Sequence, residues 1–272
     1  MEISYSKISL WKQCRKAYDW VYRRRLDPIV APVYFTLGKA IHESLAKFYS
    51  YEPFERSLDI LVNEFNTSMA NQWQGMLGSK EPEEKEEQTF DKTRKNGKVM
   101  IDKYWGKYGI DSEIPKAKTE VRLEVVLGNI TFVARLDALL PQWLLEHKTG
   151  NPDLQELALE DEQSLYYCWA AKKSGLPILG TLYNIIPNPS APKNAEMDRL
   201  EVERTDWELS KVEAEILQMA NEIESLPRLP SRGWNCRNCQ YRQLCRAEAA
   251  GGDVEYLIEQ NFRVVTSEGG TK

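Results

Sequence analysis

The sequence has no long hydrophobic run. Within its 272 residues no uninterrupted apolar stretch approaches the ~18 residues that a membrane-spanning helix needs. The first residues, Met1 to Ser4, also lack the charged and then apolar layout of a secretory signal peptide. Because 42% of the residues are hydrophobic, the chain still has enough apolar side chains for a substantial core. We therefore expect an ordered, soluble, cytoplasmic protein that makes no contact with a membrane.

Histidine and cysteine are scarce, and one common motif is missing. The chain has two histidines, His42 and His147, and five cysteines, of which three lie within ten residues near the C-terminus. In a reducing compartment such a set suits a metal or cluster site better than a disulfide framework. No Gly-x-x-x-x-Gly-Lys-Ser/Thr string occurs, so we expect no nucleotide-driven motor of the P-loop type.

Charge of both signs is present but unevenly distributed. The formal charge of −5 at pH 7 by itself argues against a nucleic-acid partner. Residues 7–25, however, hold seven basic side chains against one acid, and residues 228–246 hold five arginines and no acid. If the chain ends meet, these two basic blocks form one electropositive surface of the kind that binds phosphate backbones. A solvated basic face is the alternative.

The first 118 residues have the periodicity of helices. Apolar residues recur at steps of three and four, which places them on one helical face. Residues 79–98 are nearly all polar or charged and fit either a loop or an exposed helix. The predicted helices cover residues 4–25, as one helix or a pair, 38–49, 58–73 and a segment that ends near residue 108.

A sheet begins at Thr119, where apolar and more polar residues alternate. Gly128-Asn129 supplies a two-residue hairpin turn, and Pro141-Gln142 supplies a second turn. A helix that crosses over the sheet separates the third and fourth strands. The predicted strands are 119–127, 130–140, 143–148, 178–186 and 200–204, the crossover helix is 153–173, and a last helix starts with a capping box at 205–208.

The second hairpin carries two carboxylates that face each other. If its turn is centred on Pro141-Gln142, Asp137 lies directly opposite Glu146, and period-two alternation places Lys148 on the same face. Two carboxylates in register repel unless a cation lies between them. Such a patch can hold Mg²⁺ or Mn²⁺, lower the pKa of a bound water and support hydrolysis of phosphodiesters. A plain surface hairpin in which Arg135 neutralises both acids is the alternative.

Four short motifs follow one another from a predicted helix before the sheet, through this hairpin, to the crossover helix. They are Gly38-x-x-x-His42, Asp137, Glu146-His147-Lys148 and Gln163-x-x-x-Tyr167. In this order and spacing the chain resembles the RecB-type nucleases of the PD-(D/E)XK superfamily. The resemblance implies an α/β, restriction-endonuclease-like fold, in which a mixed central sheet is flanked by helices, with a helical insertion and a cysteine-ligated cluster region.

The resemblance also implies roles for individual residues. The expected metal ligands are His42, Asp137, Glu146 and the main-chain carbonyl of His147. The expected catalytic residues are Asp137, Glu146, Lys148, Gln163 and Tyr167. The last two lie four residues apart, hence on one helical face, and are expected to contact DNA near the scissile phosphate.

The clustered cysteines, Cys236, Cys239 and Cys245, need a fourth ligand to hold either zinc or an iron–sulfur cubane. Cys14 and Cys168 are the candidates. The string Ser4-x-Ser6-x-x-Ser9-Leu10-x-x-Cys14-x-x-x-Tyr18 resembles the segment with the first cluster cysteine in CRISPR-associated RecB-like exonucleases and the AddB nuclease domain. The resemblance implies a 4Fe–4S cluster ligated by Cys14, with Cys168 packed in the core; zinc remains the alternative.

The chain is accordingly divided into five segments. They are a helical segment with the first cluster cysteine at 1–30, a helical region at 31–118, the nuclease core at 119–226, the iron–sulfur cluster region at 227–250 and a Gly-rich polar tail at 251–272. The resemblance covers about residues 4–48 and 119–246, and no motif explains the rest.

The expected function is that of a divalent-metal-dependent DNA exonuclease in recombination, repair or DNA-end processing, with a phage as one conceivable source. Its expected partners are DNA, single-stranded or with free ends, and proteins of recombination or CRISPR adaptation. A nuclease subunit for CRISPR spacer acquisition is one alternative, and a non-catalytic DNA-end binding module is another. Intact Asp137, Glu146 and Lys148 argue against the non-catalytic alternative.

Overall fold

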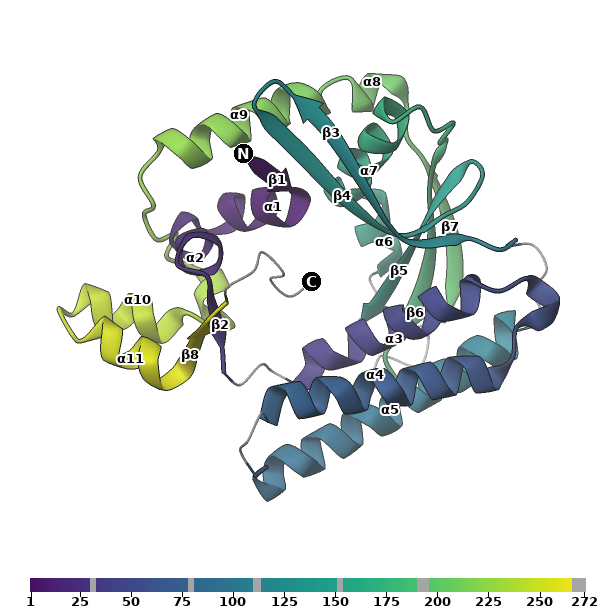
Figure 1. Ribbon diagram of the computed structural model, residues 1–272, viewed down its shortest axis with the longest axis horizontal. Coiled ribbons are helices and arrows are strands. Elements are labelled where there is room, and N and C mark those ends of the chain that lie inside the picture. Colours follow the sequence, from purple (N-terminus) through teal and green to yellow (C-terminus); the bar gives the residue numbers. More distant parts are fainter. Residues whose placement is uncertain (30–32, 78–80, 110–113, 151–153, 190–195, 266–272) are drawn as a thin grey trace. The chain divides into compact units, whose positions relative to one another are not determined.

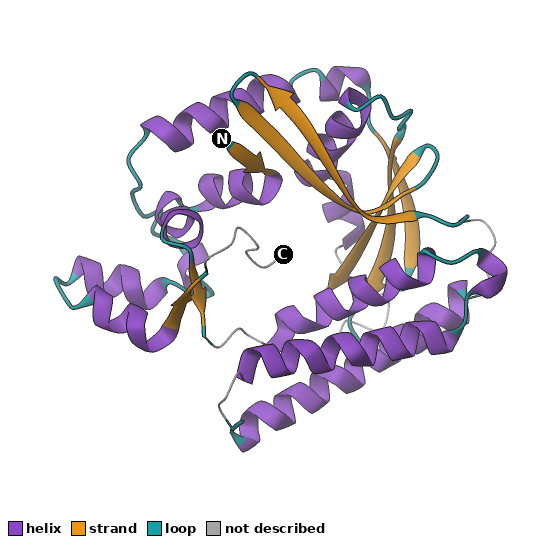
Figure 2. Ribbon diagram, viewed as in Figure 1, coloured by secondary structure: helices purple, strands orange, loops and turns teal. Residues whose placement is uncertain are grey.

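The structure, a computed structural model, describes residues 1–29, 33–77, 81–109, 114–150, 154–189 and 196–265. The chain forms two compact units (Figures 1 and 2). Unit 1 comprises Met1–Ala31, Leu127–Thr131 and Ala214–Lys272, and unit 2 comprises Pro32–Val126 and Phe132–Glu213. Both chain ends therefore belong to unit 1. None of the helices in the described ranges is long and apolar enough to cross a membrane.

Unit 2 is built on a mixed sheet. Its strands are β3 (Lys118–Leu127), β4 (Ile130–Leu139), β5 (Trp143–Gly150), β6 (Gly180–Pro187) and β7 (Asp198–Glu203). They follow the order β4-β5-β6-β7, with β3 beside β4. Strands β5 and β6 are parallel, whereas β4 and β7 are antiparallel to their neighbours. This confirms the predicted α/β fold with a mixed sheet and flanking helices.

Three long helices provide most of one hydrophobic cluster of unit 2. They are α3 (Val33–Tyr49), α4 (Leu58–Leu77) and α5 (Glu84–Tyr108). Their apolar faces pack on one another and on the sheet through Ile41, Leu45, Phe65, Met69, Ile101, Leu145 and Leu182. The polar stretch before residue 98 forms the exposed start of α5, so of the two predicted forms the helix is confirmed.

The crossover between β5 and β6 differs from the prediction. One helix was expected, but the chain forms α6 (Leu154–Leu159) and α7 (Glu162–Lys173). Asp161 interrupts the helix because its side chain caps α7, accepting a hydrogen bond from the backbone N–H of Gln163 at 3.1 Å. After β7, the predicted capping box of Thr205 and Glu208 is confirmed, but its helix α8 (Asp206–Leu209) ends after one turn.

Unit 1 combines short elements from both ends of the chain. They are β1 (Glu2–Ser4), α1 (Tyr5–Gln13), α2 (Arg15–Tyr18), η1 (Asp19–Arg23), β2 (Leu26–Pro28), most of α9 (Val212–Ser225), η3 (Trp234–Arg237), α10 (Arg242–Ala249), α11 (Val254–Asn261) and β8 (Phe262–Val264). Strand β2 pairs antiparallel with β8, and Trp20, Leu244 and Phe262 belong to their shared core. The expected polar tail thus contains a capped helix and a strand, because Asp253 caps α11 and Phe262 is buried.

Candidate active site

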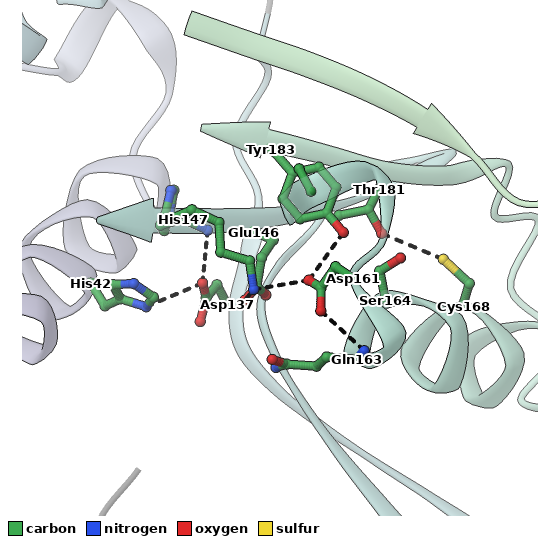
Figure 3. A network of polar contacts seen from close by, with 12 residues as sticks. His42, Asp137, Glu146, His147, Asp161, Gln163, Ser164, Cys168, Thr181 and Tyr183 are labelled. Carbon is green, nitrogen blue, oxygen red and sulfur yellow. Dashed lines mark hydrogen bonds and ion pairs between the residues drawn. The ribbon is translucent and has the colours of Figure 1, made fainter. Parts of the chain in front are cut away.

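The β4–β5 hairpin has the predicted register. Ala138 pairs with Leu145 and Leu139 pairs with Leu144, which places Asp137 opposite Glu146. The turn is closed by a hydrogen bond of 2.9 Å from the Leu140 N–H to the Trp143 carbonyl. The two carboxylates therefore face each other from adjacent strands (Figure 3).

Asp137 is held by two histidines, one through its side chain and one through its backbone. Its Oδ2 atom accepts a hydrogen bond of 3.0 Å from the backbone N–H of His147 and lies 3.2 Å from Nδ1 of His42. Burial alone would raise the pKa of Asp137, but His42 and His147 outweigh burial and hold this pKa well below its usual range. Asp137 is therefore ionised, and helix α3 presents His42 to the sheet as predicted.

Glu146 has the opposite electrostatic environment. Burial, followed by the negative charge of Asp137, raises the pKa of Glu146 to about 7. The Nζ atom of Lys148 lies 3.1 Å from Glu146 Oε1, and its charge partly offsets these effects. Arg135, by contrast, has an exposed side chain, so the cation beside the acidic pair is Lys148.

Lys148 lies between two carboxylates, one of which was not predicted from the sequence. Its Nζ atom is 2.9 Å from Asp161 Oδ2, and the same oxygen accepts a hydrogen bond of 3.1 Å from the hydroxyl of Tyr183. Burial would lower the pKa of Lys148, but Glu146 and Asp161 raise it above its ordinary value. Asp161 could have been recognised from the sequence because aspartate is a common helix-capping residue. It directly precedes Glu162, inside a segment predicted as one continuous helix.

Gln163 and Tyr167 lie beside the acidic pair. Together with Glu146 and Asp161 they line one narrow pocket at the start of α7. Tyr167 is 7% exposed, and burial followed by the charge of Glu146 raises the pKa of its phenol to about 12. The phenol is therefore a neutral hydrogen-bonding group at neutral pH, and Gln163 is one of its hydrogen-bond partners.

The His147 side chain points to the opposite face of β5 and joins a buried polar row. His147, Asn184 and Arg199 occupy paired positions on β5, β6 and β7. Asn184 Oδ1 accepts from Arg199 Nε at 3.0 Å, so the Asn184 amide nitrogen is left to donate to Nδ1 of His147, 3.1 Å away. Burial lowers the pKa of His147 to about 3, so its imidazole is neutral.

The same row connects the sheet to helix α3. Arg199 donates a hydrogen bond of 3.0 Å to the hydroxyl of Tyr49, whose ring stacks on His147. Tyr49 lies two helical turns after His42, so this contact and the contact between His42 and Asp137 tie one helix to the sheet at two points. Tyr49, Asn184 and Arg199 were not predicted as part of the site, because they have no motif of their own.

The side chains of Asp137, Glu146 and His42 are of the types that bind divalent ions. They are not, however, positioned around a single point. Among the residues that the structure describes, no three His, Cys, Asp or Glu side chains stand close enough together to hold a metal ion as placed. Asp137 and Glu146 nevertheless face each other, His42 contacts Asp137, and their oxygen and imidazole ligands suit Mg²⁺ or Mn²⁺. A cation between the acids would relieve the repulsion that raises the pKa of Glu146.

The four cysteines of the predicted cluster line a single pocket in unit 1. Cys14, Cys236, Cys239 and Cys245 border a volume of about 450 Å³. The thiol of Cys14 accepts a hydrogen bond of 3.4 Å from the Ser231 N–H, and Cys245 accepts one of 3.5 Å from the indole of Trp20. Cys168 lies elsewhere: it is buried in unit 2, with its sulfur 3.5 Å from the hydroxyl of Thr181.

Comparison with known proteins adds a family and a fold. A family model described as the PD-(D/E)XK nuclease superfamily matches residues 2–246. Among curated proteins none matches the sequence. A crystal structure from Eubacterium rectale, described as a putative exonuclease, is 11% identical and has a TM-score of 0.54, covering 89% of this chain and 87% of that one.

A second solved structure, SSO0001, is 16% identical and covers 78% of this chain and 95% of its own. Its TM-score of 0.34 is too low to support an argument. The Eubacterium rectale structure, at its low sequence identity, shows a similar fold and nothing about the chemistry of this chain.

Proposed function

The chain belongs to the PD-(D/E)XK nuclease superfamily, and from this premise we propose that it is a divalent-metal-dependent exonuclease that hydrolyses phosphodiester bonds in DNA. The observation that carries the proposal is the pair of opposed carboxylates, Asp137 and Glu146, with Lys148 3.1 Å from Glu146 on the same strand face. Exonuclease activity is part of this proposal, and the Eubacterium rectale structure of similar fold is itself described as a putative exonuclease.

The proposed metal ligands are Asp137, Glu146, His42 and the main-chain carbonyl of His147. When bound, Mg²⁺ or Mn²⁺ supplies a water of lowered pKa as the nucleophile. Asp137 is already ionised, whereas Glu146, with its pKa near 7, must give up its proton to become a ligand. The neutral, hydrogen-bonded imidazole of His147 fixes the strand from which its carbonyl projects.

Lys148 supplies the positive charge of the site. Its ammonium is held between Glu146 and Asp161, and its raised pKa keeps it protonated at neutral pH. A protonated lysine beside the scissile phosphate offsets the negative charge that develops on the phosphate oxygens. Gln163 and Tyr167, which line the pocket beside Glu146, are proposed to contact the DNA next to that phosphate.

The nuclease subgroup and the cofactor are part of the same proposal. We assign the chain to the RecB-type subgroup, with a 4Fe–4S cluster held by Cys14, Cys236, Cys239 and Cys245. The shared pocket and the N–H groups that point at two of the sulfurs support this ligand set. The proposed roles are recombination, repair or DNA-end processing.

Digestion of end-labelled linear DNA in Mg²⁺ or Mn²⁺ tests the proposed function, with a covalently closed circle of the same sequence as the control. We expect loss of the terminal label from linear DNA, no attack on the circle and no activity in a metal chelator. Glu146→Ala should be inactive, and Glu201→Ala, a change at an exposed glutamate of β7, should cut normally. Cleavage of the circle would make the protein an endonuclease, and digestion that survives both Glu146→Ala and the chelator would contradict the proposal.

A further inference from the structure

Trp234, the first residue of η3, is an aromatic side chain that the core of unit 1 does not use. It is 79% exposed, although tryptophan is among the side chains with the most apolar surface to bury. The guanidinium carbon of Arg237 lies 4.9 Å from the centre of one of its rings. The indole is thus held beside a cation on the surface and not in the interior.

The surroundings of Trp234 are positively charged. Gly233, its chain neighbour, lines the cysteine pocket together with Arg232, Arg242 and Arg246, and no acidic residue lines that pocket. Within the described part of the chain none of these three arginines forms an ion pair. All three side chains are exposed, so their charges are accessible to a polyanion.

Ion pairs neutralise part of each basic block. Lys16 forms an ion pair of 2.6 Å with Glu248, and Arg24 forms one of 2.7 Å with Glu255. In the C-terminal block only Arg228 is engaged in this way, with Asp19 at 3.6 Å. Arg15, Arg23 and Arg25 of the N-terminal block form no ion pair among the described residues either, so unpaired guanidinium groups remain in both blocks. Those of the C-terminal block lie at Trp234 and around the pocket that Gly233 lines.

A second tryptophan provides an internal comparison. Trp207 in unit 2 is 74% exposed and has the ammonium of Lys211 5.0 Å from its ring, so it matches Trp234 in exposure and in its cation. Its chain neighbours, however, are Asp206 and Glu208. An aromatic ring beside two carboxylates is a poor site for a polyanion. Trp234, whose ring lies beside Arg237 and whose chain neighbours Gly233 and Asn235 are uncharged, is a better one.

We propose that Trp234, with Arg232, Arg237 and Arg242, is a base-stacking platform for single-stranded DNA. The ring offers a stacking surface to one base, and the guanidinium groups bind the flanking phosphates. A duplex cannot use the ring in this way, because its bases are already stacked on one another. This inference rests on the proposed function, in which DNA is the substrate, and adds that the strand is bound single-stranded at this surface.

Fluorescence anisotropy of labelled DNA tests the platform with the full chain. Binding is measured without added divalent metal, so that the DNA stays intact, using a single-stranded 20-mer of thymidine and a blunt 20-bp duplex. We expect Trp234→Ala to weaken binding of the single strand about tenfold, with less than a twofold change for the duplex. Trp234→Phe should retain most of the affinity, and Trp207→Ala should bind like the wild type. Because Trp234 lies on the surface, folding and iron content should not change in any of these variants.

The same assay tests the contribution of Arg232 and Arg242 separately. Arg232→Gln combined with Arg242→Gln should reduce the salt dependence of single-strand binding, by about 0.7 in log–log slope for each phosphate that the variant no longer neutralises. Equal losses in Trp234→Ala and Trp207→Ala, equal losses on single strand and duplex, or unchanged single-strand binding by Trp234→Ala would each overturn the platform. A wild-type chain that cuts DNA but does not bind the single strand would overturn the platform alone, whereas a chain that neither cuts nor binds DNA would overturn the proposed function as well.

Discussion

The two units hold their reactive side chains in opposite ways. In unit 2 the acids and the lysine of the hairpin are largely buried, and Asp137, Glu146, Lys148 and Asp161 each have a polar partner within 3.2 Å. In unit 1 the thiols and arginines face an open pocket of about 450 Å³. The hairpin groups are therefore held by one another, whereas the groups that line the unit 1 pocket are open to a ligand. Substitutions in the two regions should therefore have different effects.

The largest effect is expected at the hairpin site of unit 2. Lys148→Ala removes the only cation within 3.2 Å of Glu146 among the described residues and should slow DNA cleavage about 10²- to 10³-fold, the usual loss when one charge-stabilising group is removed. DNA binding should change little, and circular dichroism should show that the variant is folded at the assay temperature. Lys172→Ala, which removes a lysine paired with the exposed Asp206, is the matched control and should cut at the wild-type rate. Wild-type turnover by Lys148→Ala would show that the site is elsewhere.

In unit 1 the expected effect is loss of the proposed iron–sulfur cluster. We expect about four iron atoms per chain in protein purified without oxygen. Cys14→Ala should lose this iron, and Cys168→Ala, a change at a buried cysteine outside the pocket, should keep it. Elemental analysis and the visible absorption of the cluster provide the measurement. Stoichiometric zinc without iron, or iron retained in Cys14→Ala and lost in Cys168→Ala, would contradict the proposed ligand set.

The buried row behind the hairpin should contribute stability. Asn184→Leu leaves Nδ1 of His147 and the guanidinium of Arg199 without their common partner, so the free energy of unfolding should fall by about 2–3 kcal/mol. Urea unfolding followed by circular dichroism measures this change. Asn221→Leu on the exposed face of α9 is the control, and a change within about 0.5 kcal/mol is expected there. An equally small change for Asn184→Leu would mean that the row is not part of the stable core.

The smallest effect is a gain of stability at the acidic pair. Because the pKa of Glu146 is raised in the folded state to about 7 from an ordinary 4.5, the metal-free protein loses stability as the pH rises through this interval. Glu146→Gln should therefore raise the thermal midpoint at pH 8 and leave it unchanged at pH 5. Calorimetry at the two pH values provides the test. A stabilisation that is the same at both would exclude the titration of Glu146 as its cause.

The hairpin could be predicted from the sequence because every signal that defines it is local. Two turn motifs set the strand lengths, and period-two alternation then fixes which side chains share a face, so Asp137, Glu146 and Lys148 were placed correctly. The family model and the structure confirm the mixed α/β fold on which this hairpin lies. Local signals were therefore sufficient for this part of the site.

The groups that surround the hairpin could not be predicted in the same way. Asn184 meets His147 across a parallel strand pair separated by 37 residues, and Arg199 meets Tyr49 across 150 residues. Such contacts depend on the register of strands and helices that no turn connects. Asp161 was missed for a different reason: its side chain ends one helix and begins the next, which helical periodicity alone does not reveal. The capped helix α11 was missed because only eight residues form it.

Direct binding of Mn²⁺, followed by the electron paramagnetic resonance signal of the free ion, tests the central claim that Asp137 and Glu146 form a metal site. Wild-type protein and Glu146→Gln should be titrated at pH 8, where the glutamate is ionised. The account predicts saturable binding to the wild type and an affinity at least about tenfold weaker in Glu146→Gln, which removes one of the two carboxylate ligands. Equal affinities in the two proteins would contradict it.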